Sequence, residues 1–107
     1  MMKTIITSTG NELSSKFDLR FGRARYFCLF DEDSGETKFY KNEYLNARSG
    51  VGSKVAEKMI ELGVKKIISG DFGPNAKKLL NKFQVQMVVI QDNNTTVQEI
   101  INNLNAE

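Results

Sequence analysis

The chain has 107 residues, of which 40% are hydrophobic, and its 15 lysines and arginines against 13 aspartates and glutamates leave a formal net charge of +2. This length and composition fit a single domain over residues 1–107, and the balanced charge does not point to nucleic acid as a partner. One cysteine, no signal-peptide pattern and no long apolar stretch favour a reducing compartment without membrane contact, so we expect a cytoplasmic protein.

Taken in chain order, the predicted elements alternate as β-β-β-α-β-α-β-α. Short β-branched or apolar runs predict five strands, at residues 4–7, 26–31, 37–41, 64–69 and 85–90. Apolar residues at helical spacing predict three helices, at residues 51–62, 76–83 and 97–104. Gly63 stands where a helix C-terminal glycine belongs, and Thr96 with Glu99 forms a capping-box pattern.

A hairpin followed by alternating helices and strands predicts an α/β fold with a five-stranded mixed sheet. Right-handed crossovers favour the strand order 3-2-1-4-5, in which only the second strand is antiparallel. We expect this second strand, at residues 26–31, to pair with both the first and the third. The arrangement is ribonuclease-H-like, with three helices over the sheet.

This topology brings four segments to one edge of the sheet, where the other strands end and the second strand begins. These segments are residues 8–10, 20–25, 49–54 and 69–75. Ligands of open α/β sheets bind at such an edge, and helix starts favour anions. Residues 16–25 hold four positive side chains against one negative, so we expect an anion site there. Arg20 and Arg23 would supply charge, and glycines would give access to the backbone at Gly22, Gly50, Gly52, Gly70 and Gly73.

Each of these features also has a purely structural interpretation. The arginines can form a solvated face. Residues 70–75 can simply link a strand to a helix, and residues 49–54 can be a flexible entry to a helix. We expect strand alternation to turn Arg25 away from the anion site. Cys28 lies within an apolar strand, which favours a core role.

Several catalytic classes lack their residues in this sequence. The glycines at 50 and 52 have no third glycine at position 55, and residues 49–54 lack the spacing of a P-loop. The first strand has no carboxylate, so we expect no metal-dependent cleavage of nucleic acids. Without histidine and with one cysteine, the chain offers neither a Ser-His-Asp or Cys-His nucleophile nor the usual thiolate ligands of an iron–sulfur site. We therefore expect a binding protein without catalytic or metal-ligating residues, not an enzyme.

Four stretches resemble the dinitrogenase iron–molybdenum cofactor biosynthesis family: RFGRA at 20–24, YF at 26–27, GVG at 50–52 and GDFGPNA at 70–76. The resemblance extends over nearly the whole chain. It implies the ribonuclease-H-like fold and a carrier of nitrogenase cofactor precursors, which are anionic metal–sulfur clusters. It also adds Phe21 and Asn75 to the site, because both belong to the family's motifs.

The motif departs from many family members at Arg20, where those members have a histidine that could ligate a cluster metal. An arginine can instead hold an anion through charge-assisted hydrogen bonds. The prediction is therefore a non-catalytic carrier that binds, without covalent attachment, an anionic iron–sulfur or molybdenum-containing sulfide cluster, with a cofactor-assembly protein as partner. Two alternatives stay open, namely a sensor of a small anion at the same edge and a protein-interaction domain.

Overall fold

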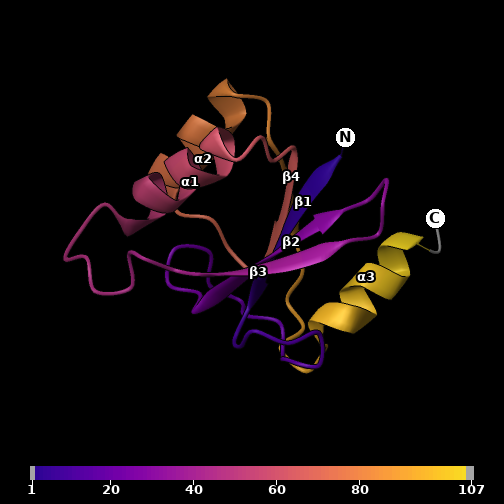
Figure 1. Cartoon of the computed structure of the whole chain (residues 1–107). Helices are drawn as coiled ribbons and strands as arrows, with labels where there is room; N and C mark the ends of the chain where they lie inside the picture. The colour runs from indigo at the N-terminus through magenta and orange to yellow at the C-terminus, as the bar shows by residue number, and fades with distance from the viewer. Residues whose placement is uncertain (1, 106–107) are drawn as a thin grey trace.

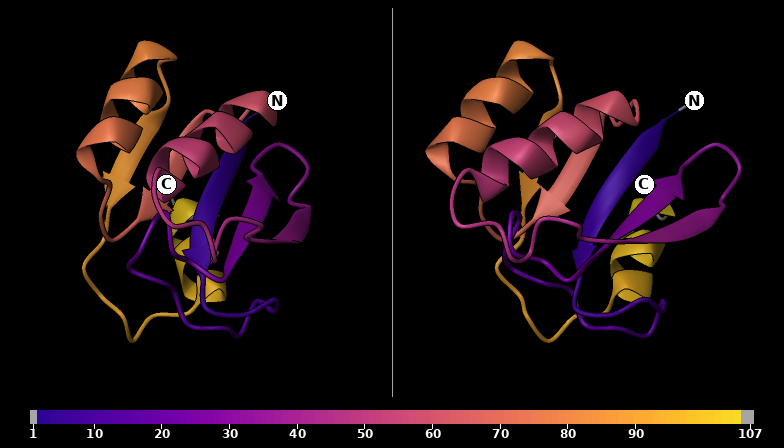
Figure 2. Two further views of the ribbon diagram at one scale, coloured as in Figure 1. Left: turned by 90° about the vertical axis from the view of Figure 1, so that its left-hand side faces the viewer. Right: turned by 60° about the vertical axis from the view of Figure 1, so that its left-hand side comes forward.

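A five-stranded sheet lies between two layers of helices in the computed structural model, which describes residues 2–105 (Figure 1). The elements, in the order predicted, are β1 (Lys3–Ser8), β2 (Tyr26–Asp31), β3 (Thr37–Lys41), α1 (Val51–Glu61), β4 (Lys66–Ser69), α2 (Pro74–Lys82), β5 (Gln86–Val89) and α3 (Val97–Asn105). Helices α1 and α2 lie side by side on one face of the sheet, and α3 covers the other, as the turned views also show (Figure 2). Within the described range no helix is long and apolar enough to cross a membrane.

The strands run in the order β3-β2-β1-β4-β5. Strand β2 pairs antiparallel with both β1 and β3, whereas β4 pairs parallel with β1 and β5, which confirms the predicted mixed sheet. At one edge Tyr26 stands opposite both Ser8 and Lys41, and Ser69 stands opposite Val89. The carboxyl ends of four strands therefore meet the start of β2 at this edge, as the topology predicted.

Local chemistry explains two element boundaries. Gly63 has a φ of +78°, and the backbone N–H of Val64 donates to the carbonyl oxygen of Met59 at 3.1 Å. This Schellman-type ending uses the N–H of Val64, so β4 begins after that residue and not at it. The predicted capping box of α3 is confirmed, because Thr96 and Glu99 exchange backbone-to-side-chain hydrogen bonds of 3.1 Å in both directions.

Side chains that alternate along the strands supply two cores, one on each face of the sheet. Ile5 and Ile67 belong to the core under α1 and α2, and the next residues, Ile6 and Ile68, belong to the core under α3. This alternation is the period of two that a strand imposes. Cys28 lies in the α3-side core with 0% exposure, which confirms the prediction that it is a core residue.

Candidate functional site

The arginine-rich segment Arg20–Arg25 has an inner side that packs on the starts of α1 and α2. The ring of Phe21 is 1% exposed, and its centroid lies 5.1 Å from that of Phe72. Gly22 approaches the first turn of α1 so closely that an added Cβ would lie 3.2 Å from the backbone nitrogen of Gly52. Apolar and backbone contacts therefore seat the segment on the helix starts.

Two further contacts join the same region to the loop after β4. A Cβ added to Gly70 would lie 2.6 Å from the Cα and the carbonyl oxygen of Leu19, so the two backbones approach more closely than a side chain would allow. The backbone N–H of Phe21 donates to Oδ1 of Asp71 at 3.2 Å. Three of the four segments that the topology assigned to this edge are therefore in direct contact.

The outer side of Arg20–Arg25 borders a hollow of about 570 Å³. Within the described chain its lining holds four cationic side chains and no carboxylate: Arg20, Arg23, Arg25, Tyr26, Lys41, Leu45 and Asn46. We call this feature the basic hollow. Its volume lies in the range of about 300–1,000 Å³ that is typical of small-molecule sites. Because cations concentrated in one concavity raise the local positive potential, the basic hollow favours an anion.

Arg20 is held by a buried carboxylate. Asp18 is 4% exposed and accepts hydrogen bonds from Nε of Arg20 at 3.1 Å, from Nη2 at 3.0 Å and from its backbone N–H at 3.0 Å. The side-chain hydrogen bonds to Asp18, and then its negative charge, raise the pKa of Arg20 above its ordinary value. The pair uses one edge of the guanidinium, and the remaining N–H donors are available to a ligand.

Arg23 is held from the opposite wall of the basic hollow. Its Nη1 donates to the carbonyl oxygen of Leu45 at 2.7 Å, and Leu45 lies in the loop that follows β3. Arg20 is thus held by a residue close to it in the chain, whereas Arg23 is held by the loop after β3. Both side chains make these hydrogen bonds without a ligand, and such preorganisation lowers the entropy that binding would cost.

The other predicted site residues lie outside the basic hollow. Gly50, with a φ of +69°, and Gly73 are exposed N-caps of α1 and α2, and neither helix start has a side-chain cap. Asn75 is exposed on α2, and Gly52 and Gly70 serve the close backbone contacts described above. Among the described residues, the structure therefore groups the two predicted arginines with each other and not with these five residues.

The remaining predicted segment, residues 8–10, turns towards α3. The backbone N–H of Thr9 donates to the carbonyl oxygen of Lys16 at 2.9 Å, and Lys16 forms a β-bridge with Thr96 at the start of α3. In the described chain this segment contributes no residue to the lining of the basic hollow.

Arg25 was expected to turn away from the anion site, but the structure places it in the basic hollow. Arg25 is exposed and lines the basic hollow together with Arg20 and Arg23. Strand alternation separates neighbouring side chains only inside a sheet. Arg25 precedes the first residue of β2, and the hollow extends around the end of that strand, so Arg25 and Tyr26 both reach it.

Sequence reasoning also missed the second wall of the basic hollow, which residues 41–46 form. The place of Lys41 could have been predicted, because the last residue of a hairpin's return strand stands beside the first residue of its outgoing strand, here Tyr26. The places of Leu45 and Asn46 could not, since they depend on the path of an irregular loop.

The side chains of the basic hollow suit an anion better than a bare metal ion. Across residues 2–105, no group of three or more histidine, cysteine, aspartate or glutamate side chains is arranged to hold a metal ion. Burial raises the pKa of the Cys28 thiol to about 12, which disfavours the thiolate that a metal needs. Guanidinium and ammonium groups instead bind anions through charge-assisted hydrogen bonds.

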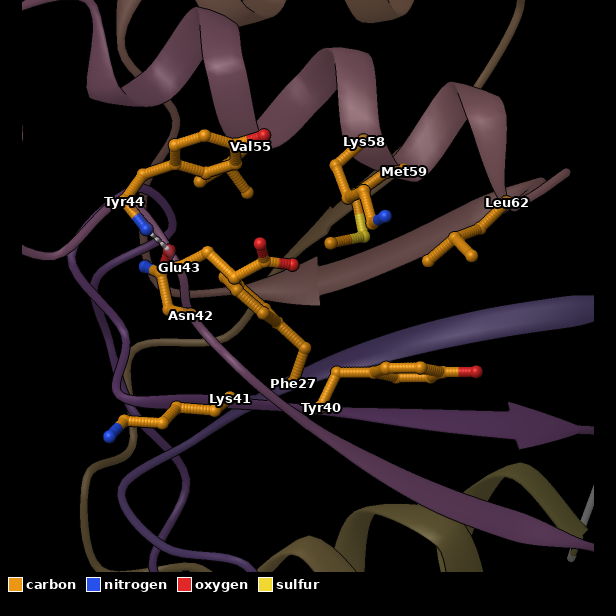
Figure 3. A pocket seen from close by; sticks show the side chains of 10 residues that line it. All are labelled: Phe27, Tyr40, Lys41, Asn42, Glu43, Tyr44, Val55, Lys58, Met59 and Leu62. Carbon is orange, nitrogen blue, oxygen red and sulfur yellow. Dashed lines mark hydrogen bonds between the residues drawn. The ribbon is translucent and has the colours of Figure 1, made fainter.

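A second, smaller pocket lies between α1 and the segment after β3 (Figure 3). Phe27, Val55 and Met59 give it an apolar floor, and its volume of about 30 Å³ has room for little more than one water molecule. The basic hollow is larger and gathers four cations from two segments, so it is the candidate site.

Comparisons with known proteins give a consistent result. A family model described as dinitrogenase iron-molybdenum cofactor matches residues 2–107. An uncharacterized protein of Methanocaldococcus jannaschii is 29% identical over 104 residues, which cover 94% of this chain and 83% of that protein. A Thermotoga protein provisionally assigned as a NifB protein has a TM-score of 0.83 at 32% identity, with 99% and 89% of the two chains covered. The apo form of the orange protein from Desulfovibrio gigas has a TM-score of 0.90 at 22% identity, with 99% and 88% covered.

Proposed function

Since the chain belongs to the dinitrogenase iron-molybdenum cofactor family, as its motifs predicted, we propose that it is a non-catalytic carrier of an anionic metal–sulfur cluster or of a cluster precursor. The family relates to biosynthesis of the iron–molybdenum cofactor. The Thermotoga neighbour, with its provisional NifB assignment, supports the same pathway and a cofactor-assembly protein as partner. We also propose that the fold is of the ribonuclease-H-like type, which the observed strand order supports.

The observation that carries the proposal is the basic hollow. Its four cations, Arg20, Arg23, Arg25 and Lys41, come from two segments and face one volume. A metal–sulfide cluster with negative charge would meet N–H donors on both sides. Charge-assisted hydrogen bonds of this kind contribute about 1.5–3 kcal/mol each. Such bonds hold a cargo firmly and release it without breaking a covalent bond, which is what a carrier requires.

A sensor of a small anionic metabolite is the second candidate, because the same cations would also hold a phosphate or a carboxylate. The two candidates differ in the size of the ligand. The four cations of the basic hollow come from two segments around a volume of about 570 Å³, and this spread favours a polynuclear cluster over a simple oxyanion.

Metal and sulfide analysis of the protein, purified without oxygen from its native host, tests the carrier role. We expect iron or molybdenum together with acid-labile sulfide in a fixed ratio to protein, lost from the Arg20→Ala/Arg23→Ala double variant. A phosphorylated or carboxylated metabolite in place of metal and sulfide would establish the sensor. Neither kind of ligand, with a protein partner retained, would establish the interaction domain.

A further inference from the structure

We propose that Asn42 is a positioning residue of the basic hollow, which it does not itself line. Its side-chain amide ties the arginine-rich segment to the loop after β3, and this tie sets the direction of Arg23. The inference rests on the proposed function, because it concerns the site that would hold the anion. Sequence analysis gave no sign of this role.

Asn42 is 4% exposed and uses every polar atom of its side chain. Its Nδ2 donates to the carbonyl oxygens of Gly22 and Ala24, both at 2.8 Å. Its Oδ1 accepts the backbone N–H of Tyr44 at 2.9 Å. Its own backbone N–H donates to the carbonyl oxygen of Arg25 at 3.0 Å. Three of these four hydrogen bonds reach the arginine-rich segment, on either side of Arg23.

The position of Asn42 explains why its effect would reach the basic hollow. In Figure 3 it lies between Lys41, which extends away from Met59, and Tyr44, whose ring packs on the core under α1. Segment 41–44 is therefore the partition between the small apolar pocket and the basic hollow, since Lys41 lines both. Asn42 is the buried, hydrogen-bonded point of that partition.

The two arginines should respond differently to the loss of this tie. Arg23 depends on the distance between its own segment and Leu45, because it donates across to that carbonyl oxygen. The side chain of Arg20 is held by Asp18, two residues before it in the chain, and has no hydrogen bond to the loop after β3 in the described structure. Loosening the partition would therefore release the side chain of Arg23 and leave that of Arg20 in place.

A ligand-free measurement tests this difference directly. Heteronuclear NOE values of the arginine Nε–Hε groups would be recorded for wild type, Asn42→Ala, Asn42→Ser and the control Asn81→Ala. Asn81 is an exposed residue of α2 outside the site. We expect Arg23 to become mobile in both Asn42 variants while Arg20 stays as ordered as in wild type. Serine retains an acceptor for the N–H of Tyr44, so Asn42→Ser keeps the test valid if the alanine variant unfolds.

Titration with tetrathiomolybdate, with melting temperatures in parallel, then connects this order to binding. Asn42→Ala should weaken binding by roughly tenfold, the effect of about one lost charge-assisted contact. In an Arg23→Ala background the same change should alter affinity by less than about twofold, because additivity fails for residues that act through one another. A purely structural role would predict equal losses in both backgrounds and mobility of both arginines.

The outcomes separate the two proposals. Failure of wild type to bind the anion would count against the carrier role, while the NMR comparison would still decide the role of Asn42. Binding by wild type with unchanged affinity in Asn42→Ala, or with Arg23 equally ordered in the variants, would overturn the positioning role alone.

Discussion

The two sides of the segment Arg20–Arg25 differ in almost every physical respect. On the inner side Phe21 and Ala24 are buried and Gly22 touches the backbone of a helix start. On the outer side the arginines are exposed and face the basic hollow. Six consecutive residues therefore combine a packing surface with a charged surface, and the packed inner side positions the backbone that carries the arginines.

This division separates stability from binding. Burial of apolar area and close backbone contact stabilise the fold, whereas exposed charges contribute little to it. Substitutions on the inner side should therefore lower the free energy of unfolding. Substitutions on the outer side should lower anion affinity at nearly constant stability, except at Arg20, whose loss leaves the buried carboxylate of Asp18 without its side-chain partner.

The largest effect is expected from Phe21→Ala. Loss of a buried phenylalanine costs about 3–5 kcal/mol, a large part of the roughly 5–15 kcal/mol that stabilises a small domain. Urea unfolding measures this cost. Phe83→Ala is the matched control, because Phe83 is 47% exposed and its loss should cost far less. Similar losses in the two variants would mean that the inner side does not support the fold.

Gly70→Ala should have the next largest effect. Its new Cβ would lie 2.6 Å from backbone atoms of Leu19, and such overpacking costs about 1–3 kcal/mol. Gly73→Ser is the control, because a Cβ there meets nothing within 4 Å and serine is a favourable N-cap. We expect a lower melting temperature only for Gly70→Ala, and an equal melting temperature would refute the close approach of the two loops.

Higher ionic strength should weaken anion binding on the outer side without lowering the stability that the inner side supplies. Raising salt from about 0.1 M to 1 M shortens the Debye length from about 10 Å to 3 Å, so affinity for tetrathiomolybdate should fall several-fold. The apolar contacts of the inner side give no reason for a parallel fall in melting temperature. A titration at two salt concentrations, with melting curves, makes the comparison. Salt-independent affinity would indicate apolar or covalent attachment.

The smallest effect on affinity is expected from Cys28→Ala, at less than about twofold.

The same variant tests the pH dependence of stability. The buried thiol holds its proton more tightly than an unfolded chain would, with a pKa of about 12 against 9.0. Its contribution to stability is thus present below about pH 9 and is lost as the pH rises towards 12. Comparing wild type and Cys28→Ala by urea unfolding across this range isolates the contribution. Loss of anion binding in the variant would show that the thiol ligates the cargo.

The fold could be predicted because its signals are local. Periodicity gave the elements, Gly63 and the pair Thr96–Glu99 gave two helix ends, and crossover handedness gave the strand order. The candidate site was only half predictable. The arginines and Asp18 are clustered in sequence, but Leu45, the partner of Arg23, lies 22 residues away and is selected by a loop path that no local pattern encodes.

Arg25 and Asn42 show the same limit in detail. The predicted orientation of Arg25 was wrong because alternation was extended beyond the end of a strand. Asn42 carried no signal at all, because its partners Gly22 and Ala24 lie 20 and 18 residues away. Side chains that bridge distant loops depend on tertiary contacts, so their roles can be recognised only in the folded structure.

The most direct test of the account is titration of wild type, Arg20→Ala and Arg23→Ala with tetrathiomolybdate, with melting temperatures in parallel. Lys77→Ala, which removes an exposed cation from α2 away from the basic hollow, controls for net charge. We predict that each arginine variant binds roughly tenfold or more weakly, since about 1.4 kcal/mol is a factor of ten. The melting temperature of Arg23→Ala and the affinity of Lys77→Ala should stay close to those of wild type. Arg20→Ala should also lower the melting temperature, because it leaves the buried carboxylate of Asp18 without its side-chain partner. Equal affinity in all four proteins would contradict the central claim that these arginines hold an anion.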